Sequence, residues 1–178
     1  MADILMGVTG GAAAFKAVSL ASMLRKAGHS VKSVLSPGGM KFITPIQLSA
    51  VTGEPCHTEL FSGDNLIPHI SLTDHLDLMI VAPATAHFIA RAAQGLADDL
   101  LTASFLACSA PVVIAPAMNT RMWENPAVVR NVSVLKERGI VFAGPAQGKL
   151  ACGTTGAGRL MEPADIYRIC CDVLKGDR

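Results

Sequence analysis

The sequence predicts an α/β protein whose core is a doubly wound parallel sheet with helices on both faces. Short apolar runs alternate along the chain with segments of helical periodicity, and this alternation is typical of βαβ units with right-handed crossovers. Most of the apolar runs are nearly continuous, as strands covered on both faces should be. Sheets of this Rossmann-like or flavodoxin-like kind bind ligands beyond the carboxyl ends of their strands.

Five strands are expected, at residues 4–8, 31–35, 77–82, 111–115 and 139–143. The first two flank a helical segment, 13–28, in which Phe15, Val18 and Leu24 fall roughly on one side. Gly28 supplies a stop signal at the end of this helix.

Three further helices are expected within residues 95–108, 126–139 and 161–174. Asp98 and Asp99 fall in the expected first turn of the first of them, where negative charge favours the helix dipole. Asn125 and Pro126 form an N-cap followed by proline at the first helical position, which predicts the start of the second.

The composition is unusually apolar for a soluble monomer. The 178 residues are enough for one domain, expected over residues 1–178, and 51% of them are hydrophobic and only 16% charged. The best membrane-spanning candidate, 105–118, is shorter than the roughly 18 residues required and contains two prolines, so no membrane span is expected. No signal peptide is expected, because the N-terminus has an early Asp and no basic region. We therefore expect the surplus apolar surface to be buried against other subunits.

Charge and cysteine usage narrow the class further. The net charge is +1 with no basic run, which gives no support to nucleic-acid binding. The cysteines form no C-x-x-C pair and no even framework, which fits free thiols in a reducing cytoplasm. They are Cys56, Cys108, Cys152, Cys170 and Cys171.

The first loop that could carry chemistry is GVTGGAAAFK, residues 7–16, a strand followed by a glycine-rich turn and a helix. Backbone amides around Gly10 and Gly11 and the positive helix end would suit a phosphate, although a tight turn that needs glycine is the plain alternative. The loop matches neither a P-loop nor a G-x-G-x-x-G fingerprint. The second strand ends in Ser36 with no acidic residue, which suits a monophosphate better than a ribose diol.

Two further stretches follow or precede the third expected strand. In VAPATAHF, residues 81–88, small side chains would let a flat ligand approach the backbone, although plain packing explains them equally well. His69 in PHISLTDH could act as an acid or base at a strand-end crevice, or could be a surface or capping histidine. His75, six residues on, shares no helix face with it, so no metal site is expected.

Two loops late in the chain are the most distinctive. PAMNTRMWENP, residues 116–126, places Asn119 and the only tryptophan, Trp123, in a proline-bracketed loop. GKLACGTTGAGRL, residues 148–160, surrounds Cys152 with four glycines, which predicts a flexible flap with an accessible cysteine.

His69 in HISL, the PAMNTRMW loop and LACGTTGAGRL occur in an order and spacing that resemble the homo-oligomeric flavin-containing cysteine decarboxylases, over about residues 3–165. The resemblance implies FMN at a subunit interface, in a homotrimer or a homododecamer of trimers. It implies that Asn119 holds the substrate carboxylate, that Met122 and Ala151 contact substrate, and that Trp123 braces the loop or a neighbouring subunit. It implies that His69 is the base or orienting group and Cys152 the proton donor. The implied FMN contacts are Gly10, Gly11, Ser36, Ala84, Thr85, Ala86 and His87.

The family chemistry also implies a function. A thiol is oxidised to a thioaldehyde, which makes an electron sink for loss of CO₂, and the enethiol that results is reduced again. We expect decarboxylation of 4′-phosphopantothenoylcysteine, a small cysteinyl substrate, to 4′-phosphopantetheine in coenzyme A biosynthesis. The alternative is oxidative decarboxylation of the C-terminal cysteine of a peptide, by members that generally lack the flap cysteine. A third reading is a flavin-binding regulator without turnover, although His69, Asn119 and Cys152 are all in place.

The sequence departs from the family pattern at three places. His87 and Phe88 stand where the usual PATANT stretch has Asn and Thr, Ser36 replaces a threonine, and the flap ends in GRL instead of GRM. These changes leave the flavin contacts open, and His87 could be a simple packing substitution. Many bacterial members are fused to a synthetase, so the chain is either free-standing or the N-terminal part of such a fusion.

Overall fold

The computed structural model describes residues 1–61, 67–149, 153 and 155–176. Its six-stranded sheet has the order β3-β2-β1-β4-β5-β6, and every neighbouring pair is parallel. In that order the strands are Cys56–His57, Ser30–Leu35, Asp3–Val8, Leu78–Ala84, Val112–Pro116 and Val141–Phe142. This is the strand order of Rossmann-type doubly wound sheets, with the switch point between β1 and β4. The predicted fold class is confirmed.

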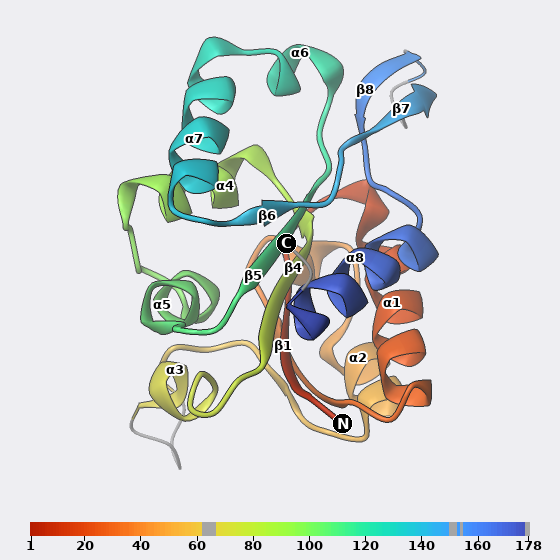
Figure 1. Ribbon diagram of the computed structural model, residues 1–178, viewed down its shortest axis with the longest axis vertical. Helices are drawn as coiled ribbons and strands as arrows, with labels where there is room; N and C mark the ends of the chain where they lie inside the picture. Colours follow the sequence, from red (N-terminus) through yellow and green to blue (C-terminus); the bar gives the residue numbers. More distant parts are fainter. Residues whose placement is uncertain (62–66, 150–152, 154, 177–178) are drawn as a thin grey trace.

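Helices cover both faces of the sheet (Figure 1). One face packs against α1 (Phe15–Lys26), α2 (Pro45–Thr52) and α8 (Pro163–Lys175), and the other against α4 (Ala86–Gln94), α5 (Leu100–Ala107) and α7 (Pro126–Glu137). Alternate strand residues serve the two cores, because successive side chains point to opposite faces. In β1, Ile4 and Met6 join the first core and Leu5 the second.

Helix α5 packs closely enough on β1 to exclude a side chain. A Cβ atom on Gly7 would lie 2.3 Å from Leu101 Cδ1. Phe88 of α4 and Phe105 of α5 close the same core with an edge-to-face contact, with ring centroids 5.7 Å apart. This packing fixes the starts of α4 and α5 beside the carboxyl end of β1.

The structure corrects several local predictions. Residues 86–94 form α4, a helix that is not among those expected from the sequence, although its buried residues Phe88, Ile89, Ala92 and Ala93 have helical spacing. His69 lies on a short helix, α3 (Pro68–Ser71), which Pro68 opens at a first helical position. Asp99 is the N-cap of α5 and lies just before its first turn.

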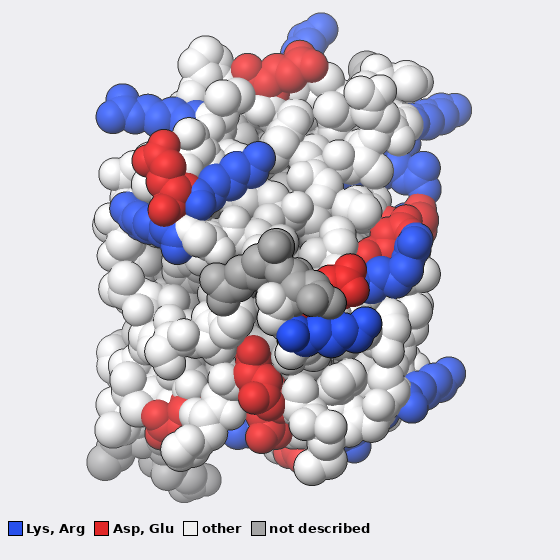
Figure 2. All heavy atoms as spheres, in the orientation of Figure 1, with Lys and Arg blue, Asp and Glu red and all other residues white. Residues whose placement is uncertain are grey.

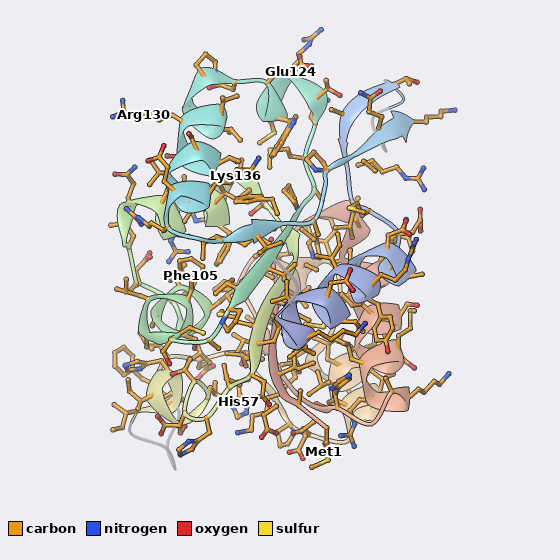
Figure 3. All side chains as sticks on the ribbon, in the orientation of Figure 1. Met1, His57, Phe105, Glu124, Arg130 and Lys136 are labelled. Atoms are coloured by element: carbon orange, nitrogen blue, oxygen red, sulfur yellow. The ribbon has the colours of Figure 1, made fainter. Side chains whose placement is uncertain are left out.

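The segment predicted as a flap begins and ends in strands. β7 (Ala146–Lys149) and β8 (Thr155–Arg159) form an antiparallel pair. The sequence did not predict these strands, because glycine is uncommon in strands. The short α6 (Thr120–Trp123) and the turns η1 (Ala12–Ala14) and η2 (Gly39–Lys41) complete the described elements. Met1 and Glu124 lie at opposite ends of the molecule, so α6 lies far from the N-terminus (Figure 3).

The surface combines scattered charges with broad uncharged areas (Figure 2). Several large apolar side chains are exposed among the described residues. They include Phe15, Phe42, Ile46, Phe61, Ile67, Ile70 and Leu106. Within the described part of the chain, no helix has the length and apolar character needed to cross a membrane.

Candidate functional site

A cavity of about 850 Å³ lies at the carboxyl ends of β1, β2, β4 and β5. This is the place where a doubly wound sheet binds ligands, because the loops after β1 and β4 diverge at the switch point. The volume is within the range of sites for cofactors and drug-sized molecules. Four of the loops predicted from sequence contribute to its walls, at residues 9–13, 36–38, 85–88 and 117–119.

The wall beyond β1 and β2 is built mainly from backbone. A Cβ atom on Gly10 would lie 2.6 Å from the carbonyl carbon of Gly38, so the two loops meet as glycine against glycine. Ser36 is buried, and its Oγ accepts a hydrogen bond of 3.1 Å from the Gly39 amide. Because that oxygen is already an acceptor, the Ser36 hydroxyl hydrogen is left to donate.

Thr9 joins the two sides of the switch point. Its buried hydroxyl donates to the carbonyl of Pro83 at 2.8 Å and accepts from the amide of Thr85 at 3.0 Å. The end of β1 is thereby tied to the start of α4. The sequence reading did not single out Thr9.

The start of α4 faces the cavity with its positive end. Thr85 is the N-cap, and its Oγ1 accepts from the Phe88 amide at 3.3 Å while its carbonyl accepts from Ile89. The amides of Ala86 and His87 precede the first hydrogen bonds within the helix. They therefore offer donors to an acidic or carbonyl group in the cavity.

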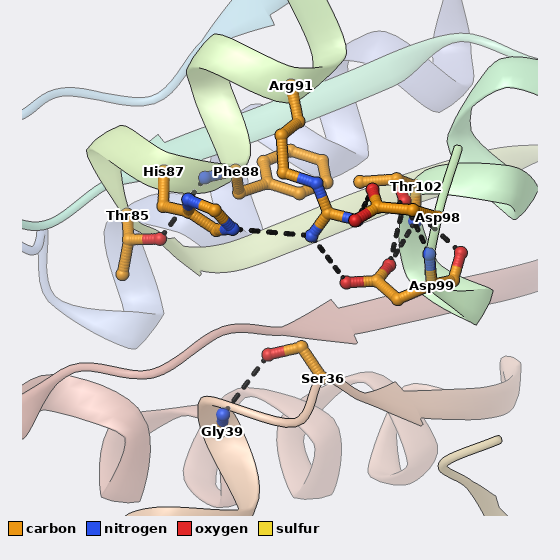
Figure 4. Close-up of polar contacts among 9 residues, drawn as sticks. All are labelled: Ser36, Gly39, Thr85, His87, Phe88, Arg91, Asp98, Asp99 and Thr102. Carbon is orange, nitrogen blue, oxygen red and sulfur yellow. Dashed lines mark hydrogen bonds and ion pairs between the residues drawn. The ribbon is translucent and has the colours of Figure 1, made fainter. Parts of the chain in front are cut away.

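Beside these amides lies an ionic cluster (Figure 4). Arg91 Nη1 donates to Asp99 Oδ2 at 2.7 Å, and Nη2 donates to Thr102 Oγ1 at 3.2 Å and pairs with Asp98. The Arg91 and Asp99 side chains are only 11% and 15% exposed, whereas Asp98 is 75% exposed. Burial alone would raise the pKa of Asp99, but bonds from the Thr102 amide and from Arg91 outweigh it and hold that pKa below its usual value.

The loop with the tryptophan forms the third wall. Asn119 is the N-cap of α6, and its Oδ1 accepts from the Arg121 amide at 2.8 Å. Met122 is exposed at the cavity, whereas Trp123 is half-buried against the core beneath α4 and α7. Strand β8 holds the loop from the other side, since the Met118 amide donates to Gly158. A Cβ atom on Gly158 would lie 2.3 Å from the Met118 carbonyl, and its φ of +132° also requires glycine.

Basic side chains lie at the rim. Lys16 donates to both carboxylate oxygens of Glu162 at 2.9 Å, and Arg159 pairs with the same carboxylate. The bond from Lys16 is the main cause that lowers the pKa of Glu162. Lys149 also lines the cavity.

The structure brings most of the predicted site residues together at the cavity, but not Ala84 or His69. Gly10, Gly11, Ser36, Thr85, Ala86, His87, Asn119 and Met122 all line the cavity. Ala84 does not, because it is a fully buried residue of β4. Ala151 and Cys152 lie outside the described residues.

His69 also lies away from the cavity of its own chain. It is on α3, which precedes β4 and packs against α5, so the expectation of a strand-end position is wrong. Figure 1 shows α3 at the end of the molecule opposite α6. The side chain is half-buried, and its Nδ1 is buried with no hydrogen-bond partner among the described residues.

Several lining residues were missed in the sequence. Thr9, Gly38, Lys149 and Arg159 line the cavity, as do the three members of the ionic cluster, Arg91, Asp98 and Asp99. Gly38 could have been found, since the Ser-Pro-Gly-Gly run after a strand signals a close backbone turn. Arg91 carried no signal of its own, because its role depends on its contact with α5.

Fold and cavity together define a doubly wound α/β protein with a ligand site at its topological switch point. The chain belongs to the Flavoprotein family, whose model matches residues 1–175. It is 45% identical over 169 residues to the coenzyme A biosynthesis bifunctional protein CoaBC of Bacillus subtilis, a match that covers 94% of this chain and 42% of that protein. CoaBC of Mycolicibacterium smegmatis is 44% identical, over 92% of this chain and 39% of that protein. The chain thus spans about two fifths of the length of these curated relatives.

Solved structures give the same picture. A mutant of PPC decarboxylase complexed with pantothenoylaminoethenethiol matches with a TM-score of 0.88 and 29% identity, over 98% of both chains. The FMN-dependent cysteine decarboxylase SpaF matches with a TM-score of 0.79 and 33% identity, over 96% of this chain and 97% of that one.

Proposed function

We propose that this chain is an FMN-dependent decarboxylase that converts 4′-phosphopantothenoylcysteine to 4′-phosphopantetheine in cytoplasmic coenzyme A biosynthesis. The observation that carries the proposal is the cavity at the switch point, with Asn119 and Met122 over a wall of glycine and helix amides. The family membership and the match to a PPC decarboxylase structure support it. We further propose that residues 1–178 form one flavoprotein domain.

The cavity fits FMN in two respects. The Gly10–Gly38 contact leaves a wall without side chains, and a Cβ atom on Gly11 would meet nothing within 4 Å, so a flat ligand can approach the backbone. The backbone amides of Ala86 and His87 at the start of α4 and the Ser36 hydroxyl supply donors for phosphate or ring oxygens. Gly10, Gly11, Ser36, Thr85, Ala86 and His87 are the residues that would hold the cofactor. When bound, FMN would accept two electrons from the thiol-bearing carbon and return them after CO₂ has left, so that the net change is loss of CO₂ alone.

Asn119 is the residue we assign to the substrate carboxylate. Its Oδ1 accepts a hydrogen bond from the Arg121 amide, which fixes the carboxamide at the cavity wall, and a carboxamide carries the N–H groups that a carboxylate can accept from. Replacing Asn119 by Asp should abolish decarboxylation while FMN stays bound, because two carboxylates would then repel each other. The yellow colour and turnover of Asn119→Asp measure the two effects separately, and retained activity would refute the assignment.

His69 is proposed to act in the site of a neighbouring copy. Ile67 and Ile70 on its own short segment are exposed, as is Leu106 of α5, against which α3 packs. Phe15, which lines the cavity, is also exposed. Burial of the apolar side chains around α3 against Phe15 of the next copy, in a closed ring, would bring His69 to that copy's cavity, as a base for the substrate thiol. A homotrimer, alone or in a dodecamer, is the assembly we propose.

Mixing two inactive variants tests this arrangement. His69→Asn and Asn119→Asp subunits, unfolded together and reassembled, should regain activity at roughly a quarter of the sites, since one intact copy of each residue can then meet. Each variant reassembled alone is the control. If the mixture stays inactive while native mass spectrometry shows assemblies that contain both variants, His69 does not act across an interface.

Cys152 is proposed as the proton donor for the final reduction, on the strength of the family resemblance. Product masses from 4′-phosphopantothenoylcysteine decide between the branches. Loss of CO₂ alone supports the proposal, whereas loss of CO₂ plus two hydrogens would mean chemistry that stops at the enethiol. No reaction with this substrate, but turnover of a peptide ending in cysteine, would favour the peptide alternative.

A further inference from the structure

His87 and Arg91 lie one turn apart on α4, and both line the cavity. Arg91 is held on its far side by Asp99, Asp98 and Thr102, all of which lie at or next to the start of α5. Its Nη1 lies 3.4 Å from Nε2 of His87, which is itself exposed (Figure 4). The contacts with Asp98, Asp99 and Thr102 therefore fix the guanidinium, and Nη1 presents its second hydrogen to the imidazole, whereas the buried Nε has no hydrogen-bond partner among the described residues.

This contact favours one tautomer of the histidine. A guanidinium carries donors only, so Nε2 of His87 must accept the hydrogen bond. An imidazole that accepts at Nε2 is neutral and carries its proton on Nδ1. In Figure 4 that second ring nitrogen lies on the Thr85 side of the ring, next to the cavity-lining start of α4.

We propose that Arg91 is a positioning residue that holds His87 with Nε2 as acceptor and the proton on Nδ1, so that the start of α4 presents one further hydrogen-bond donor to an acceptor atom of the bound cofactor. The cofactor part of this inference rests on the proposed function. The tautomer itself is a property of this chain alone, because it follows from the ionic cluster of α4 and α5.

The proposal also explains how the chain tolerates its departure from the usual motif. The asparagine found at this position in the family pattern offers both a donor and an acceptor. In a histidine without a partner, either ring nitrogen can be the donor. In a histidine whose Nε2 accepts from Arg91, Nδ1 is the donor and the acceptor is already occupied. If the tautomer is confirmed, His87 has a polar role at the start of α4 and is not only a packing substitution.

Long-range proton–nitrogen correlation spectra of protein labelled with ¹⁵N-histidine test the tautomer directly. We expect the His87 signal, assigned by its loss in His87→Gln, to show a protonated Nδ1 and an unprotonated Nε2. In Arg91→Lys this pattern should be lost, because the ammonium group lacks the planar, forked donors with which arginine contacts Asp99 and His87 at the same time. Arg168→Lys, which alters an exposed Arg–Asp pair on α8, is the matched control and should leave the signal unchanged.

The flavin gives an independent reading on the same samples. His87→Ala and Arg91→Lys should both shift the absorption spectrum of bound FMN, and His87→Ala should weaken FMN binding by about 2- to 10-fold, as expected for one hydrogen bond. A proton on Nε2 in the wild-type protein would overturn the proposal, even if Arg91→Lys does not fold. A wild-type protein with the predicted tautomer but no affinity for FMN would instead overturn the proposed function.

Discussion

Where the loops after β1 and β2 meet, the cavity wall is mainly backbone, whereas the wall beyond β4 contains a cluster of charged side chains. The first wall requires residues without side chains, since Gly10 and Gly38 meet where no Cβ atom would fit. The second wall requires particular side chains, since Arg91 is held by Asp98, Asp99 and Thr102. Thr9 connects the two walls through Pro83 and Thr85.

The difference teaches that the two walls should fail in different ways. A wall of close backbone contacts fails by steric exclusion, which cannot be relieved by pH or salt. A wall of ion pairs fails by loss of charge, and its contribution should therefore titrate. The expected effects below run from the largest to the smallest.

Gly10→Val should do the most damage. The new side chain would start 2.6 Å from the Gly38 backbone, so one of the two loops must move. We expect a loss of about 3 kcal/mol in the free energy of unfolding and the loss of most bound flavin. Gly11→Ala is the matched control, because its Cβ atom meets nothing within 4 Å, and it should keep its melting temperature. A Gly10→Val protein that stays yellow with an unchanged melting temperature would contradict this account of the wall.

The glycine wall was predictable from sequence because its signals are local. A turn that follows a buried strand and opens a helix is contained in ten residues around Gly10 and Gly11, and Ser36 follows the next strand in the same way. The charged wall was not predictable, because Arg91 and Asp99 belong to different helices and carry no motif. His69 was misplaced for a related reason. It precedes β4, and a parallel strand has its ligand-binding end after it.

Asp99→Asn should come second, at about 2 kcal/mol at neutral pH. The substitution keeps a side chain that can cap α5 but leaves the largely buried Arg91 guanidinium with only the exposed Asp98 as an anionic partner. Asp98→Asn, at a mostly exposed pair, should cost less than about 0.5 kcal/mol and is the control.

The pH dependence gives this prediction a sign. The folded-state pKa of Asp99 lies below its ordinary value, so its stabilising contribution is complete above the unfolded pKa of about 4 and is lost as the pH falls through the lower, folded value. Denaturant unfolding of wild type and Asp99→Asn should therefore differ most at neutral pH and converge in acid. A difference that stays constant down to low pH would mean that the carboxylate acts by shape alone.

Thr9→Val should have the smallest effect of the three, about 1 kcal/mol, because the connection between the walls consists of two hydrogen bonds from one hydroxyl. Valine keeps the volume but leaves the Thr85 amide without its acceptor, while the Pro83 carbonyl still receives the backbone amide of residue 9. Thr9→Ser retains the hydroxyl and should lie close to wild type in chemical denaturation. If valine and serine destabilise equally, the methyl group and not the hydroxyl matters at this position. If valine also lowers flavin affinity while serine does not, the connection positions the start of α4 for the cofactor as well as stabilising the fold.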